Sequence, residues 1–408
     1  MRRRELIVGG ATGMAALGGA LPAWAQGGKE LVLAGSLPLT GPAAETGLNV
    51  QSGYVAATSF LNEKLGGVEI GGEKYRIKLR LSDDASDPAR AVSLVQKELD
   101  NDTSLFLGSF GSNILLPTTA QVERAGKLMV QAGGAADQIF TQGFKNIFGL
   151  FPRSTRQFDT MARFFASLTP KPATVSFVST NDGYGKSQMS GAIASCEQQG
   201  FRVLDRFVLP EKPNDFSSVL TAMRGRMPDA LVTTLHDNEA LLLTRQMVAT
   251  GTNVKMIFHS LGPQAENFRK VMGKYANGLA VAVPWVEDAP FKDRFFGDAK
   301  GYADWYRAKI NRPVSYHSAA AAACVVTYVL AMQQARSATD VPSIRKALAA
   351  ADFETLYGRI RFTPDGDGDP QSLKVGQVQA GRIALVFPES VRVAPVIHPL
   401  PEWQSKAA

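Results

Sequence analysis

The stretch from Leu31 to Gly47, LVLAGSLPLTGPAAETG, combines residue types that could bind an anion. An apolar strand over 31–35 runs into a loop of Ser, Pro, Thr and Gly that includes Thr40, and the pattern predicts a helix beginning near Pro42 or Ala44. A helix that follows such a loop presents unpaired backbone N–H groups, which suit a carboxylate or a phosphate. An ordinary turn between a strand and a helix, with no ligand, has the same sequence features. The rest of the chain favours the binding interpretation.

Small and polar residues also follow the later predicted strands. These residues are Ser109 and Ser112, the run Ala132-Gly133-Gly134, Tyr184, His236 with Asp237, and Ser260. In open parallel sheets, ligands bind beyond the carboxyl ends of the strands. The loops that carry these residues therefore form the candidate site.

Signatures of catalysis and of metal binding are missing from the sequence. It contains no G-x-S-x-G elbow, H-E-x-x-H motif, Walker motif or dinucleotide-binding glycine fingerprint, and its four histidines lack metal-ligand spacing. The acidic loop at 365–369 is interpreted as a turn, because Pro370 and Gly376 stand where a calcium loop needs Gly and Glu. We therefore expect no enzyme activity and no cofactor; a secreted hydrolase is the alternative from another class.

Length and composition predict two cores. The chain has 408 residues, of which 45% are hydrophobic and 20% charged, values typical of a soluble protein too long for one domain. Loss of the first 25 residues would lower the net charge of +7 by two, to +5. That mild charge is spread along the chain without Lys/Arg runs, which argues against a nucleic-acid partner.

The first 25 residues resemble a cleaved export signal. Arg2, Arg3 and Arg4 precede an apolar, glycine-broken run over 6–21, and Ala23-Trp24-Ala25 offers the small residues of a cleavage site. The run is too short and too rich in glycine for a good membrane span. We expect a periplasmic protein exported by the Sec or the twin-arginine route, with no lipid anchor because no cysteine follows the cleavage site.

The two cysteines, Cys196 and Cys324, lie within predicted helices among Ala, Ser and Val. They could pair in an oxidising compartment, but such neighbours favour buried free thiols.

The order of the predicted elements indicates an α/β fold with two doubly wound lobes. Strand, small polar loop and helix alternate from the first strand to about residue 149, and the same order starts again at about residue 150. That alternation is typical of parallel sheets covered by helices on both faces. Three further strands are predicted near the C-terminus, over 358–362, 374–379 and 383–387.

Five segments, in order, resemble the periplasmic substrate-binding proteins of ABC importers, of the branched-chain amino acid type. They are SLPLTGPAAETG, SDDASDPARAV, NDGYG, NDFSSVLTAMR and LYGRIRFTPDGDG. The resemblance implies a type I periplasmic binding protein: two lobes joined by three crossings, which close on a ligand between them. The N-terminal lobe would comprise 27–149 and 284–370, and the C-terminal lobe 150–283 and 371–408. It also implies a monomer that delivers its ligand to a membrane permease with separate ATPase subunits.

The resemblance assigns roles to residues of the N-terminal lobe. Ser112, with Ser109 close by, falls where the family offers a serine, whose hydroxyl and neighbouring loop N–H groups hold the ligand's carboxylate. Ala132-Gly133-Gly134 stands where an Ala-Ala-Thr or Ala-Ser-Thr run is usual, so the backbone N–H groups remain but the hydroxyl is missing.

In the C-terminal lobe, Tyr184 matches the aromatic residue that lies against the ligand. His236 or Asp237 falls where an aromatic residue is frequent, and Ser260 where the amino-acid binders place an acid for the ligand's ammonium. A buried ammonium without an acid would be costly. The sequence therefore ranks an aromatic or branched carboxylate slightly above a hydrophobic amino acid, unless Asp237 supplies the acid. A sensory module of the same fold is a further alternative.

Overall fold

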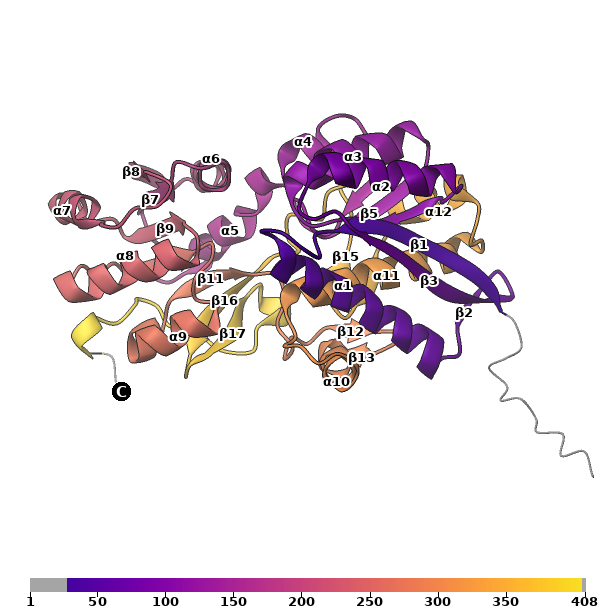
Figure 1. The fold of residues 1–408 in the computed structure, drawn as a ribbon. Helices are drawn as coiled ribbons and strands as arrows, with labels where there is room; N and C mark the ends of the chain where they lie inside the picture. The colour runs from indigo at the N-terminus through magenta and orange to yellow at the C-terminus, as the bar shows by residue number, and fades with distance from the viewer. Residues whose placement is uncertain (1–27, 406–408) are drawn as a thin grey trace, which may run out of the picture.

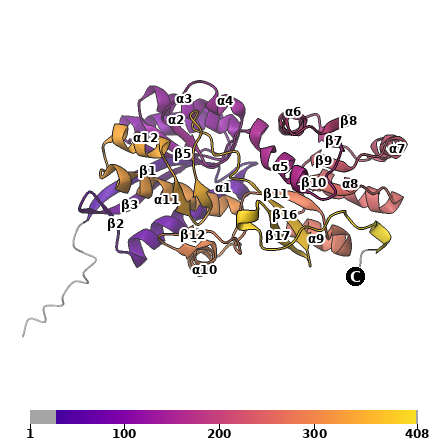
Figure 2. The ribbon, with the colours of Figure 1, turned by 180° about the vertical axis from the view of Figure 1, so that it is seen from behind.

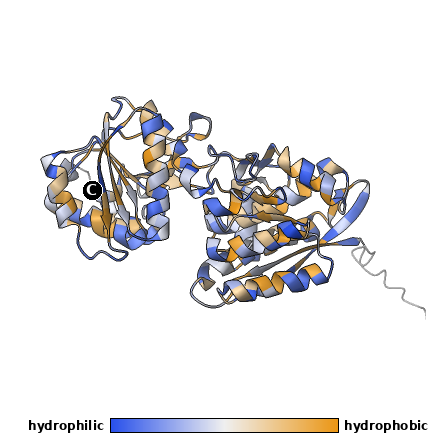
Figure 3. Ribbon diagram, turned by 90° about the horizontal axis from the view of Figure 1, so that it is seen from above, coloured by the Kyte–Doolittle hydropathy of each residue, from blue (hydrophilic) through white to orange (hydrophobic). Residues whose placement is uncertain are grey.

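The structure is a computed structural model, and it describes residues 28–405. The predicted export signal lies outside the described residues. Two sheets, each with helices on both faces, stand side by side along the molecule (Figure 1). From above they form two bodies, with many of the hydrophobic residues on the strands and on the helices beside them (Figure 3). We call the body around the six-stranded sheet the N-terminal lobe and the body around the seven-stranded sheet the C-terminal lobe.

The sheet of the N-terminal lobe has the order β2-β3-β1-β4-β5-β6. Its strands are β1 (Lys29–Leu37), β2 (Val68–Ile70), β3 (Glu73–Asp83), β4 (Leu105–Leu107), β5 (Leu128–Gln131) and β6 (Ile147–Gly149). All neighbours pair in parallel except β2, which forms an antiparallel hairpin with β3. The loops that leave β1, β3, β4 and β5 therefore share one edge of the sheet.

The sheet of the C-terminal lobe has the order β17-β16-β11-β10-β9-β7-β8. Its strands are β7 (Thr174–Thr180), β8 (Arg202–Leu209), β9 (Ala230–Thr234), β10 (Met256–His259), β11 (Ala280–Val283), β16 (Lys374–Gln379) and β17 (Arg382–Phe387). The first five are parallel, and β16 and β17 extend the sheet in antiparallel fashion. The doubly wound α/β fold is confirmed.

Helices cover both faces of each sheet, as amphipathic segments must when a sheet is apolar on both sides. In the N-terminal lobe these are α1 (Ala44–Ser59), α2 (Pro88–Asp100), α3 (Ser112–Arg124), α4 (Asp137–Phe140), α10 (Ala299–Lys309), α11 (Tyr316–Ala335) and α12 (Val341–Ala349). In the C-terminal lobe they are α5 (Asp159–Ser167), α6 (Gly183–Gln198), α7 (Ser217–Gly225), α8 (Asp237–Thr250) and α9 (Glu266–Met272). The view from behind shows α11 and α12 with the N-terminal lobe, and β16 and β17 with the C-terminal lobe (Figure 2).

The core of the N-terminal lobe is organised around α11, which packs against α1. A Cβ on Gly53 of α1 would lie 2.1 Å from the carbonyl oxygen of Ser318, so only glycine permits this approach. The Tyr328 hydroxyl donates to the carbonyls of Phe106 and Leu128 at 2.9 and 3.0 Å, tying α11 to β4 and β5. Helix α11 is long and apolar enough to cross a membrane, but 83% of its most apolar window is buried in the protein.

The three predicted C-terminal strands form, but they do not share a sheet. The first becomes β15 (Gly358–Ile360), which pairs only with β14 (Phe353–Thr355) in a separate ribbon beside α11. The other two become β16 and β17. The register of β16 with β11 depends on residues almost a hundred positions apart, which the local pattern does not contain, and β17 pairs with β16.

An ion pair joins two of the segments that pass between the lobes. The Arg153 guanidinium, just after β6, donates to Asp367 at 2.8 and 3.1 Å and to Asp365 at 2.7 Å. Asp367 is fully buried. Burial favours its neutral form, but hydrogen bonds from Arg153 and Thr363 outweigh this and hold the pKa of Asp367 below its usual value. The predicted turn at 365–369 is therefore confirmed, with Asp367 bound to an arginine.

We expect Arg153→Met to lower the free energy of unfolding by about 3 to 5 kcal/mol at pH 7, because it leaves the Asp367 carboxylate buried without its cation. A pKa held low stabilises the fold fully above the ordinary aspartate pKa of 3.8, and this contribution is lost as pH falls through the lower folded value. The difference between variant and wild type should therefore shrink toward pH 4, where the unpaired Asp367 of the variant takes up a proton. Urea unfolding at both pH values measures it; Arg206→Met, which breaks an exposed pair with Glu197, is the control. A difference independent of pH would contradict this account.

Candidate functional site

Ser112 lies at the start of α3, beside the loop that follows β5. Its hydroxyl oxygen accepts the N–H groups of Ala135 and Ala136, each at 3.2 Å, and keeps its own proton for another acceptor. Within residues 28–405, no hydrogen bond is recorded for the backbone N–H groups of Ser112 and Asn113. The first turn of α3 therefore presents two N–H groups, a hydroxyl and the positive end of a helix dipole, which together suit a carboxylate.

Ser109 and Thr40 are engaged within the protein. The Ser109 hydroxyl donates to Asp84 at 2.8 Å, and the Thr40 hydroxyl donates to Asp83 at 2.7 Å. Asp83 is the last residue of β3, and Asp84 is the first residue after it. Neither hydroxyl has a second proton to give to a carboxylate ligand, so these two residues hold loops in place.

The glycines of Ala132-Gly133-Gly134 are required by packing. A Cβ on Gly133 would lie 1.9 Å from the carbonyl oxygen of Ser109, and a Cβ on Gly134, where the family's threonine would stand, would lie 2.7 Å from Cδ1 of Leu115. The N–H groups of Gly133 and Gly134 donate to Oε1 of Gln131 at 2.8 and 2.9 Å. From the sequence, we expected these two groups to hold a ligand; in the structure both are bonded to Gln131.

Tyr184 lies in the first turn of α6, although the sequence predicted a loop here. The helix begins at Gly183 because Asp182 caps it, accepting the N–H of Gly185 at 2.8 Å. The Tyr184 ring stacks on His236 with ring centroids 4.8 Å apart, and Nε2 of His236 lies 3.5 Å from Asp182. The ends of β7 and β9 thus contribute one polar and aromatic cluster.

Ser260 and Asp237 complete this edge of the C-terminal lobe. Ser260 is buried, and its hydroxyl donates to the carbonyl of Leu235 at 3.1 Å. Asp237 is exposed at the start of α8, where one carboxylate oxygen accepts the N–H of Gly262 at 2.7 Å. Ser260 therefore cannot replace an acid, whereas Asp237 has a second carboxylate oxygen without a bond among residues 28–405. Partial removal from water raises the pKa of Asp237, and the hydrogen bond from Gly262 opposes this shift.

Aromatic residues of the N-terminal lobe, which sequence reasoning did not identify, lie next to these groups. Tyr316 and His317 begin α11; the His317 ring lies 5.3 Å from Phe110, and the Tyr316 ring lies 6.5 Å from Phe151. Phe151 in turn lies 6.2 Å from Tyr357. A possible signal was the Tyr-His pair directly after Ser315, which caps α11.

Electrostatic interactions link the two sets of residues. Partial removal from water raises the pKa of Tyr184; a hydrogen bond with Ser260 opposes the shift, and Tyr316 and Asp237 add to it. Burial and the charge of Asp237 likewise raise the pKa of Tyr316. Burial lowers the pKa of His317 to about 4, so this ring is neutral at pH 7. Asp237 of one lobe thus contributes to the pKa shift of Tyr316 of the other, and Tyr316 contributes to that of Tyr184.

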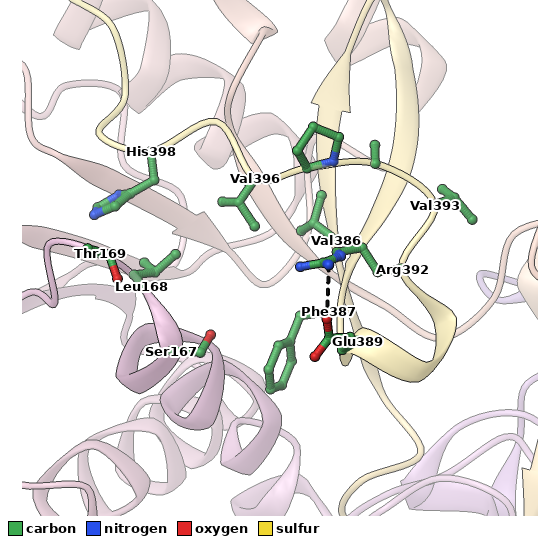
Figure 4. A pocket seen from close by; sticks show the side chains of 12 residues that line it. Ser167, Leu168, Thr169, Val386, Phe387, Glu389, Arg392, Val393, Val396 and His398 are labelled. Carbon is green, nitrogen blue, oxygen red and sulfur yellow. Dashed lines mark hydrogen bonds and ion pairs between the residues drawn. The ribbon is translucent and has the colours of Figure 1, made fainter.

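A cavity of about 690 Å³ lies elsewhere, between the end of α5, the end of β17 and the segment that follows β17 (Figure 4). None of the residues expected at the site lines it. Its one drawn ion pair, between Arg392 and Glu389 at 3.0 Å, is internal to the C-terminal segment. We therefore place the candidate site at the strand ends.

The described residues form neither a metal-binding cluster nor a disulfide bond. No group of three or more metal-ligating side chains occurs in the part of the chain that the structure describes. Cys196 and Cys324 are both buried and free, which confirms the expectation that they stay unpaired.

Ser109→Ala should lower the free energy of unfolding by about 1 to 3 kcal/mol, because the buried Asp84 loses a hydrogen-bond donor. Urea unfolding measures the loss, and Ser93→Ala, on the exposed face of α2, is the matched control. Equal stabilities for the two variants would show that the bond between Ser109 and Asp84 contributes nothing.

Comparison with known proteins agrees with this architecture. Residues 31–382 match the family model of the periplasmic binding proteins. The Leu/Ile/Val-binding protein BraC3 of Rhizobium johnstonii is 26% identical over 347 residues, which cover 85% of this chain and 91% of that protein. A leucine-, isoleucine-, valine-, threonine- and alanine-binding protein of Pseudomonas aeruginosa is 24% identical over 83% of this chain and 86% of its own length.

Solved structures show the same fold. A putative branched-chain amino acid ABC transporter protein from Silicibacter pomeroyi superposes with a TM-score of 0.78 at 18% identity, over 92% of this chain and 100% of that one. A solute-binding protein from R. palustris in complex with benzoate has a TM-score of 0.65 at 16% identity, over 90% of this chain and 98% of that one. The family match spans most of the chain, and the two-lobed α/β architecture agrees with it: this chain belongs to the periplasmic binding protein family and has its type I fold.

Proposed function

We propose that this protein is an exported receptor that binds a hydrophobic amino acid between its lobes and delivers it to the permease of an ABC transporter. The observation that carries the proposal is the set of polar groups left without a bond, within the described chain, at the strand ends: the Ser112 hydroxyl proton at the start of α3 in one lobe, and one carboxylate oxygen of Asp237 in the other. The membership of the family and the names of its relatives, which bind Leu, Ile and Val, support it.

Each part of an amino acid has a counterpart among these residues. The carboxylate would accept the N–H groups of Ser112 and Asn113 and the Ser112 hydroxyl. The ammonium would pair with Asp237, which supplies the acid that Ser260 lacks. An apolar side chain would contact the rings of Phe110 and Tyr316.

A second candidate is an aromatic carboxylate without an ammonium. The aromatic lining by Phe110, Phe151, Tyr316 and Tyr357 favours it, and so does the structural neighbour in complex with benzoate. The presence of a carboxylate at Asp237, which would repel a second anion, places this candidate after the amino acid.

Binding would act through closure of the lobes. A ligand that contacts both lobes favours the arrangement in which both sets of contacts form. We propose that 27–149 with 284–370, and 150–283 with 371–408, move as the two lobes of a monomer in the periplasm. The pair between Arg153 and Asp367 lies near their boundary. A permease and its ATPases encoded nearby would distinguish transport from sensing.

Matched pairs of ligands test the role assigned to Asp237. We expect leucine and phenylalanine to raise the Tm of the wild type more than 4-methylpentanoate and 3-phenylpropanoate, because a bound ligand stabilises by mass action. Asp237→Asn should weaken binding of the amino acids about tenfold or more, or about 1.4 kcal/mol, and leave the acids without an ammonium nearly unaffected.

Asp100→Asn, an exposed change on α2, is the control for that experiment. A Tm response to benzoate or 3-phenylpropanoate, with none to the amino acids, would overturn the ranking in favour of the aromatic carboxylate.

Tyr184→Ala tests the location of the site. The variant should bind its ligand about tenfold or more weakly, measured by calorimetry. The Tm of the ligand-free variant should stay within a few degrees of the wild type, because the half-buried ring packs mainly on His236. Unchanged affinity would place the site elsewhere.

A further inference from the structure

A second cavity, of about 310 Å³, lies between the two lobes and shares no residue with the candidate site. Arg163 of α5 lines it on one side, and Arg359 of β15 with Arg361 lines it on the other. Residues after the third crossing and after β17, including Ser372 and Ser390, complete the wall. The cavity is within the size range of small-molecule sites.

The arginines of this cavity belong to different cores. Helix α5 packs with the C-terminal lobe, through Met161 and Phe164 among others. Strand β15 packs with the N-terminal lobe, through Ile360. A ligand bound to arginines from both elements would therefore connect the lobes.

The residues that line the cavity carry more positive than negative charge. Arg359 and Arg361 share one carboxylate: each donates through Nε and Nη2 to Asp352, so Nη1 of each is left out of this bonding. Asp369 is the one acidic residue in the lining, and one of its oxygens accepts the N–H of Gln371. The lining itself therefore carries three guanidinium groups and one carboxylate; outside it, Asp352 bonds two of the arginines and Glu354 lies opposite Arg359 across the ribbon of β14 and β15.

Arg163 itself has no ion pair or hydrogen bond recorded among residues 28–405. Its side chain is partly buried. Arg156, which precedes α5 in the chain, pairs with Asp159. A partly buried guanidinium offers five donors, and polar groups that leave water normally find acceptors. The matching acceptor is an oxyanion, which arginine binds through two parallel hydrogen bonds.

We propose that this cavity binds a small oxyanion, of the phosphate, sulfate or polycarboxylate class, through Arg163 and the free Nη1 groups of Arg359 and Arg361. The hydroxyls of Ser372 and Ser390 lie in the same wall and can donate to it. Because the anion contacts both lobes, it stabilises the arrangement of the lobes seen here. The site adds an effector to the protein, at a place separate from the solute bound at the strand ends.

The experiment uses the full mature protein and titrates phosphate, sulfate or citrate against chloride at constant ionic strength, with Tm and calorimetry as readouts. The wild type should show a saturable rise in Tm for at least one oxyanion, with heat of binding for the same anion. Arg163→Gln should abolish the saturable response. Because Arg163 has no recorded partner, this variant should fold with the Tm of the wild type in chloride. Arg206→Gln, an exposed arginine on β8, should respond as the wild type does.

The outcomes separate a site from a general salt effect. Phosphate and sulfate stabilise many proteins by exclusion from the surface, an effect that does not saturate and does not depend on one side chain. An equal response in the wild type and both variants, or a response without saturation, would overturn the proposal. A preference for citrate over phosphate would assign the site to polycarboxylates, and the reverse preference to phosphate or sulfate.

Discussion

The buried ion pair between Arg153 and Asp367 is the interaction on which the relation of the two lobes depends. It fastens the first segment that passes between the lobes to the third, and backbone hydrogen bonds from Gly149 to Gly366 and from Gly368 to Phe151 run beside it. Breaking a charge pair in such a place is costly, because either partner left alone would be an uncompensated buried charge. These contacts connect the segments that pass between the lobes. They do not involve the groups at the strand ends to which we assign the ligand.

The polar groups at those strand ends divide into two kinds. Some hold the loops: Ser109 binds Asp84, Thr40 binds Asp83, and Gln131 takes the N–H groups of the glycine run. Others keep unused capacity, namely the start of α3 and the carboxylate of Asp237. Only the second kind can exchange water for a ligand at little cost, because the first would have to break bonds already made.

Arginine plays both parts in the same molecule. At the crossing, the guanidinium of Arg153 bonds two carboxylates through Nε and Nη2 and is structural. In the cavity between α5 and β15, Arg163 has donors to spare. We therefore propose two distinct places where a ligand contacts both lobes, one beside aromatic rings and carboxylates and one beside guanidinium groups. An ensemble with two such places can respond to two chemically different ligands.

The local pattern of the chain determined most of the architecture. Alternating strands, small polar loops and helices predicted both doubly wound sheets, and the fold bore this out because a buried parallel strand and its covering helix each have a recognisable period. The same pattern located the carboxyl ends of the strands, although Ser112, Tyr184 and Asp237, which were expected in the loops there, lie in the first turns of α3, α6 and α8. The free state of both cysteines also followed from their neighbours.

Only the tertiary structure decided which groups in those loops are still available. The Ser109 hydroxyl bonds Asp84, which is distant in the sequence, instead of a ligand. The N–H of Gly133 bonds Gln131, because the chain turns back on itself there. The local sequence pattern contains neither contact. The aromatic side of the site, at Tyr316 and Tyr357, escaped prediction for the same reason: α11 reaches the strand ends only when it packs on α1. Sequence determines what each segment can form by itself, whereas the pairing of buried polar groups is settled by which segments the fold brings within hydrogen-bonding distance.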